Sequence, residues 1–99
     1  MTKTIIDWQS TIKEFNDKRD WSTPHCIKDL LLNVVEEVGE ARNIIKWIPE
    51  ERSLDLIKKN KAEWDDFIGQ IQYLVLKMAY LTDTNTDDAI KTVMTEFEQ

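Results

Sequence analysis

Hydrophobic positions recur along the chain at intervals of three and four, which is the period of an amphipathic α-helix. Segments with this spacing predict helices at residues 4–19, 26–46, 61–82 and 86–97. Short polar or proline-containing stretches separate these segments. Residues 50–60 are strongly charged and predict a short helix or a mobile connection. The chain has only two glycines and two prolines, so a turn-rich sheet is not expected. The pattern therefore predicts an all-α fold.

The apolar stripe of each predicted helix indicates the face that should be buried. In the first helix Trp8 and Phe15 follow the stripe, and both are expected in the core. The second helix is apolar over much of its circumference, so we expect it to be central. Its Gly39 costs about 1 kcal/mol relative to alanine inside a helix. The close approach of another backbone or of a ligand would explain a glycine at this position.

Two pairs of carboxylates interrupt these apolar stripes. Glu37 and Glu40 lie in the second helix, and Glu63 and Asp66 lie in the third. Because residues three apart share one face of a helix, the carboxylates of each pair should be neighbours. Carboxylates on a core-facing stripe are costly unless something positive compensates them, and a hard divalent cation with oxygen ligands is the simplest candidate. The alternative is a solvated charged face.

A carboxylate cage of this kind suits a phosphorylated substrate, because Mg²⁺ is usually bound by a few carboxylates together with substrate phosphates. Glu36 is then the candidate to position or deprotonate an attacking water. A di-iron site is a rival, but its Glu-x-x-His motifs are absent from both acidic pairs. Nucleophilic catalysis by the adjacent His25 and Cys26 is a second rival, for which no third orienting group is evident.

Residues 20–25 break the helical pattern between the first two helices. They carry an aromatic ring, Trp21, and the histidine of the chain, His25. Loops held between rigid helices often supply ligand contacts, although a packed tryptophan and a solvated histidine would explain the same residues. The densest basic cluster consists of Lys58, Lys59 and Lys61. It is either a solvated charge run or a phosphate-attracting patch.

Composition narrows the classes of function. The net charge of −6 argues against a nucleic-acid binder, which normally shows a basic patch. A single cysteine cannot form an internal disulfide, and no apolar leader or run of 18 apolar residues is present, so we expect a cytoplasmic protein without a membrane partner. Residues 1–99 are expected to form one domain, and a domain this small should gain core by oligomerising.

Taken together, two motifs resemble a known family. The first runs through Arg19-Asp20-Trp21, His25, Leu30-Leu31-Leu32, Glu36-Glu37-Val38-Gly39-Glu40 and Trp47, and the second is Glu63-x-x-Asp66. Over residues 15–80 the chain is similar to the MazG-like nucleotide pyrophosphohydrolases, nearest to their dCTP pyrophosphatase-like branch. Ile27 and Asp29 stand where that branch often has proline and asparagine, which leaves the base preference open.

The resemblance implies a four- to five-helix bundle assembled through an oligomeric helical core, as a homodimer or homotetramer with active sites near the subunit contacts. It implies Mg²⁺ as cofactor, with Mn²⁺ as a possible substitute. The implied reaction cleaves a nucleoside triphosphate, such as dCTP or a non-canonical deoxynucleotide, between the α and β phosphates. The products would be a monophosphate and pyrophosphate, and the role would be sanitation of the nucleotide pool.

The resemblance also implies roles for particular residues. The metal ligands would be Glu37, Glu40, Glu63 and Asp66. Glu36 matches the first acid of the longer motif and completes the catalytic set. Trp21 and Trp47 match aromatic positions near the nucleotide, and His25 matches a position in the base or sugar pocket.

Two other functions remain open from the sequence. One is a pyrophosphohydrolase for a different nucleotide, such as phosphoribosyl-ATP. The other is a non-catalytic regulatory or assembly module that keeps the helical scaffold. In such a module the acidic residues would be solvated and would bind metal weakly.

Overall fold

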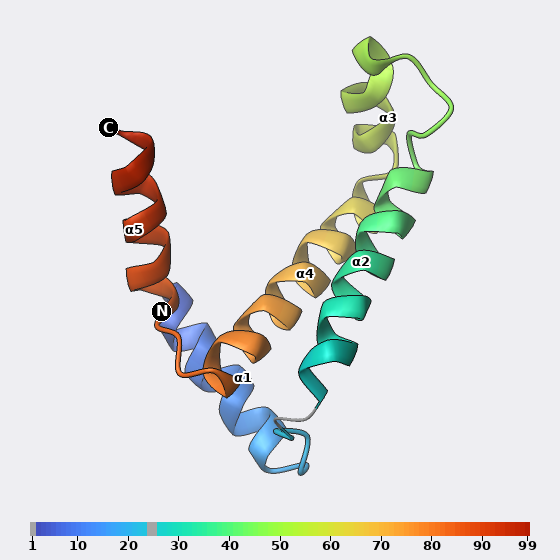
Figure 1. Ribbon diagram of the computed structural model, residues 1–99. Helices are drawn as coiled ribbons and strands as arrows, with labels where there is room; N and C mark the ends of the chain where they lie inside the picture. The colour runs from blue at the N-terminus through green and yellow to red at the C-terminus, as the bar shows by residue number, and fades with distance from the viewer. Residues whose placement is uncertain (1, 24–25) are drawn as a thin grey trace. The chain divides into compact units, whose positions relative to one another are not determined.

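The computed structural model describes residues 2–23 and 26–99. These residues form the helices α1 (Ile5–Asp17), α2 (Ile27–Asn43), α3 (Ser53–Lys59), α4 (Lys61–Leu81) and α5 (Thr86–Phe97), with a short 3₁₀ helix, η2 (Glu50–Arg52), directly before α3 (Figure 1). No strand occurs in the described part of the chain. The predicted all-α class is therefore confirmed, as is a short helix between the second and third predicted helices.

The chain divides into two compact units. The terminal unit comprises residues 1–27 and 75–99, and the central unit comprises residues 28–74. The division between the two units falls within the residue range of α4. A single domain over residues 1–99 stays a prediction.

Helix α1 begins with a capping box. The Asp7 backbone N–H donates to Thr4 Oγ1 at 3.2 Å, and the Thr4 backbone N–H donates to Asp7 Oδ2 at 3.0 Å. The two bonds satisfy backbone donors that no helix can satisfy internally at its N-terminus. Hydrogen bonds from Thr4 lower the pKa of Asp7, because they favour its charged form.

Helices α1 and α4 end in the same way, slightly before the predicted residues 19 and 82. Asp20 and Asp83 each have a positive φ of 55°. In each case the next backbone N–H bonds to a carbonyl five residues earlier, at 2.9 Å. This is the Schellman arrangement, which satisfies the last carbonyls of a helix and usually places glycine at the left-handed position.

Helix α2 ends three residues before the predicted residue 46. The backbone N–H groups of Ile44 and Ile45 bond to carbonyls three residues back, at 3.2 and 3.0 Å. The chain therefore leaves the α-helical pattern for tight turns before it reaches Pro49, which precedes η2. Proline is compatible with such a start, because it has no backbone N–H to place in the preceding turn.

The terminal unit is held together partly by a polar side chain. Helix α1 packs against α5, and Gln9 is 7% exposed between them. Gln9 Nε2 donates to the Thr84 carbonyl at 2.8 Å, and Thr86 Oγ1 donates to Gln9 Oε1 at 2.7 Å. The prediction that Trp8 and Phe15 lie in the core is wrong for the single chain, where 49% and 43% of them are exposed.

The central unit buries one face of α2. Leu30 and Ala41 are the buried residues of this helix. The apolar side chains that remain exposed on the same helix are Leu31, Leu32, Val35 and Val38. A Cβ placed on Gly39 would meet nothing within 4 Å, so no close approach inside the chain explains this glycine. None of the helices in the described residues has the length and apolar character needed to cross a membrane.

Candidate metal and nucleotide site

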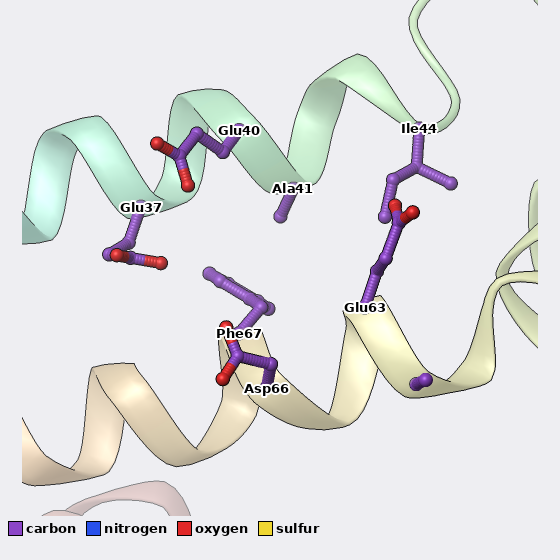
Figure 2. A pocket seen from close by; sticks show the side chains of 8 residues that line it. Glu37, Glu40, Ala41, Ile44, Glu63, Asp66 and Phe67 are labelled. Atoms are coloured by element: carbon purple, nitrogen blue, oxygen red, sulfur yellow. The ribbon is translucent and has the colours of Figure 1, made fainter.

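Helices α2 and α4 line one pocket within the central unit. Its lining residues are Glu37, Glu40, Ala41, Ile44, Ala62, Glu63, Asp66 and Phe67. The pocket has a volume of about 470 Å³, which is in the range of small-molecule sites. Both predicted acidic pairs therefore belong to the same pocket (Figure 2).

Local sequence explains how each helix presents its acidic pair. Glu37 follows the same stripe as the buried Ala41, one helical turn before it, so this carboxylate faces inward and is half-buried. Asn60 links α3 to α4, and its carbonyl accepts from Trp64 N–H at 3.0 Å in the first turn of α4. Glu63 lies in that first turn, where the helix dipole stabilises a negative charge.

The four carboxylates are not evenly spread around the pocket. Figure 2 shows Glu37 and Glu40 reaching from α2 and Asp66 reaching from α4, whereas the Glu63 carboxylate lies beside Ile44. The pKa of Glu37 is raised, mainly by burial and then by the negative charges of Glu40, Asp66 and Glu36. The pocket therefore concentrates negative charge around one half-buried carboxylate.

The donor set has the right chemistry for a hard cation, since it consists of carboxylate oxygens. Among the residues that the structure describes, however, no three His, Cys, Asp or Glu side chains lie close enough together to hold one ion. The predicted ligands therefore line the same pocket, but they are not arranged as a complete coordination sphere. Their oxygen atoms suit a cation that keeps several of its waters, as Mg²⁺ does.

Other residues predicted for the site lie outside the pocket lining. Glu36 is exposed on α2, and Trp47 is 87% exposed, with Lys46 Nζ 5.2 Å from its ring centre. Trp21 belongs to the terminal unit, where its ring meets Phe15 edge-on at 5.9 Å between centroids. His25 lies outside the described residues.

The basic cluster does not line the pocket. Lys58 and Lys59 lie in the last turn of α3, and Lys61 pairs with Asp65 on the exposed surface of α4. Its attraction for phosphate stays a prediction.

Sequence reasoning missed the apolar part of the pocket. Ala41, Ile44, Ala62 and Phe67 line it together with the carboxylates. Phe67 also contacts Trp64, with ring centroids 5.2 Å apart. The sequence signal for Phe67 is its position directly after Asp66 and one helical turn after Glu63.

Comparison with curated proteins finds a partial relative, the dCTP pyrophosphatase 1 of Bos taurus. The two are 40% identical over 48 residues, which cover 48% of this chain and 28% of that protein. The match therefore spans less than a third of the relative's length. No protein-family model matches the chain, and no solved structure matches it. The sequence similarity indicates a relationship to a nucleotide pyrophosphatase over about half of the chain.

Proposed function

We propose that the central unit holds the active site of a nucleoside triphosphate pyrophosphohydrolase, which cleaves its substrate between the α and β phosphates. The observation that carries the proposal is the shared pocket, in which carboxylates from α2 and α4 line a cavity of about 470 Å³. Phosphoryl chemistry requires a site that collects cations against substrate phosphates, and carboxylates from two facing helices meet this requirement.

In this proposal the metal ligands are Glu37, Glu40, Glu63 and Asp66, with Mg²⁺ as the natural ion and Mn²⁺ as a substitute. A bound Mg²⁺ would neutralise phosphate charge and acidify a bound water. The raised pKa of Glu37 supports this role, because the crowding of negative charge that raises it is the crowding that a cation relieves.

Glu36 is proposed to orient or deprotonate the attacking water. Its negative charge contributes to the raised pKa of Glu37, so the two carboxylates interact electrostatically. Glu36 is exposed and directly precedes the lining residue Glu37, and it is not one of the proposed metal ligands, which leaves its carboxylate as the candidate base.

The proposed substrate is a deoxynucleoside triphosphate such as dCTP, or a non-canonical analogue removed from the nucleotide pool. The similarity to a dCTP pyrophosphatase over about half of the chain supports this choice. Trp21, His25 and Trp47 are proposed nucleotide contacts, on the basis of the resemblance described above.

Product analysis tests the proposal directly. The purified protein is incubated with Mg²⁺ and each ordinary and deoxynucleoside triphosphate in turn, and the products are separated by ion exchange. We expect a monophosphate and pyrophosphate from at least one substrate, with the fastest turnover identifying the preferred base. A diphosphate and phosphate would reject the cleavage position. The absence of any product, together with no Mg²⁺-dependent rise in melting temperature, would favour a non-catalytic module.

A further inference from the structure

We propose that Phe67 binds the base of the nucleotide, so that the apolar part of the pocket is the base subsite. The inference rests on the proposed function and adds a residue that neither the motifs nor the resemblance points to. It follows from the chemistry of the pocket lining and from the way that Phe67 is held.

The pocket has two chemically different parts. Four carboxylates, from Glu37, Glu40, Glu63 and Asp66, supply the charged part, and the apolar lining comes from Ala41, Ile44, Ala62 and Phe67. A ligand made only of phosphate and metal would leave the apolar surface without a partner. With a divalent cation between the carboxylates and the phosphates, a nucleotide matches both parts, because it joins an anionic phosphate chain to a planar ring with apolar faces.

Phe67 is the aromatic side chain among the residues that line the pocket. Figure 2 shows it extending from α4 towards α2, with Glu37 and Glu40 on one side and Ile44 and Glu63 on the other. It is half-buried, so part of the ring remains open to the cavity. Aromatic rings bind nucleic-acid bases by stacking, and every base offers a face for this contact.

A second aromatic ring contacts Phe67. Trp64 lies one turn earlier on α4, and the two ring planes are tilted by 50° with centroids 5.2 Å apart. Such a pair restricts the rotation of the phenylalanine, which lowers the conformational entropy lost when a ligand packs against it. The orientation of the Phe67 ring is therefore restricted before a ligand binds.

The tryptophans are placed differently within their own units. Trp47 is 87% exposed and does not line the pocket. Trp21 packs against Phe15 in the terminal unit. Of these aromatic side chains, Phe67 alone shares a pocket with the carboxylates.

The test separates base binding from phosphate binding. Titration calorimetry in the presence of Mg²⁺ measures the affinity for two ligands. One is dCMP, which carries a base but no phosphoanhydride bond, and the other is inorganic tripolyphosphate, which carries no base. Phe67→Leu keeps an apolar side chain and removes the aromatic face, whereas Phe67→Tyr keeps the face. Phe97→Leu is the matched control, because it makes the same change at an exposed position of α5, outside the pocket.

We expect Phe67→Leu to weaken dCMP binding about tenfold and to raise the KM for dCTP by the same factor. The kcat and the affinity for tripolyphosphate should stay unchanged, and Phe67→Tyr should restore dCMP affinity. An unchanged dCMP affinity, equal weakening of both ligands, or no dCMP binding by the unmodified protein would overturn the inference. If dCMP binds through Phe67 but no nucleotide is hydrolysed, the base subsite stands and the proposed function fails.

Discussion

At the scale of single residues, Glu37 is the pocket carboxylate whose pKa is raised by its surroundings. It is half-buried, and three other carboxylates raise its pKa in addition to the effect of burial. A charged group in such surroundings destabilises the folded state, because the unfolded chain offers it full hydration and more distant neighbours. A bound cation would offset this destabilisation, because it binds the folded state.

The raised pKa predicts the pH dependence of stability. Since the folded pKa of Glu37 lies above its ordinary value of 4.5, its contribution to stability is full below pH 4.5 and is lost as the pH rises through the folded pKa. Glu37→Gln should therefore raise the melting temperature at pH 7 and change it little at pH 4. Glu51→Gln, on η2 and outside the pocket, is the control. A larger effect at pH 4 than at pH 7 would contradict the prediction.

Substitution of the proposed metal ligands should reduce activity without unfolding the protein. Glu37→Gln and Asp66→Asn each remove a proposed ligand charge with little change in volume, so both should lower turnover by at least about 100-fold while the circular dichroism spectrum stays helical. Product formation under saturating nucleotide and Mg²⁺ measures the effect, and Glu51→Gln should retain full activity. Near-normal turnover in both pocket variants would reject the metal-site assignment.

At the scale of elements, the helices are limited by local hydrogen bonds at their ends. Thr4 caps α1, and Asn85 Oδ1 accepts from Asp88 N–H at 3.0 Å to cap α5. At their other ends α1 and α4 use aspartate in the left-handed conformation, where glycine is the usual residue.

The left-handed position after α4 is a site for stabilisation. Asp83→Gly should raise the free energy of unfolding by about 0.5–1 kcal/mol, because glycine adopts a positive φ without a Cβ clash. Asp83→Ala keeps the clash and loses a side chain that tolerates this conformation, so it should destabilise. Urea titrations of both variants measure the difference. If glycine and alanine have the same effect, backbone strain is not the cause.

At the scale of the whole molecule, the single chain leaves many large apolar side chains exposed. On α2 these include Val35, at 65% exposure, and Val38, at 49%. The neighbouring Gly39 has open space around it. We propose that this surface is covered by a second copy of the chain, in a homodimer or homotetramer, since exposed apolar patches of soluble proteins commonly mark interfaces.

Light scattering tests the assembly. The unmodified protein should elute as a dimer or tetramer, and Val35→Glu should shift it to monomer because a buried carboxylate without a partner is costly. Thr95→Glu adds the same charge at an exposed position of α5 and should leave the assembly intact. Gly39→Ala should weaken assembly if a backbone approaches there. An unmodified protein that is monomeric at micromolar concentration would reject the proposal.

Much of the local structure could be predicted from the sequence. The helical period located α1, α2, α4 and α5, with the ends of α1 and α4 correct to within two residues, whereas for residues 50–60 it left a short helix and a mobile connection as alternatives. The same period placed Glu37 with Glu40, and Glu63 with Asp66, because residues three apart share a helix face. These features depend on neighbours within a few residues. The end of α2 was less predictable, since its last turn loosens before Pro49 is reached.

The burial of particular side chains depended on contacts that are distant in sequence. Gln9 is buried and Trp8 is exposed. Gln9 donates to the Thr84 carbonyl, which lies 75 residues further along the chain, so no local pattern could reveal this contact. Periodicity identifies the face of a helix but not what covers it. By itself the sequence determined the helices and which carboxylates share a face. Only the tertiary structure decided that both acidic pairs line one pocket and that Phe67 lines it with them, because that outcome requires two helices to be brought together.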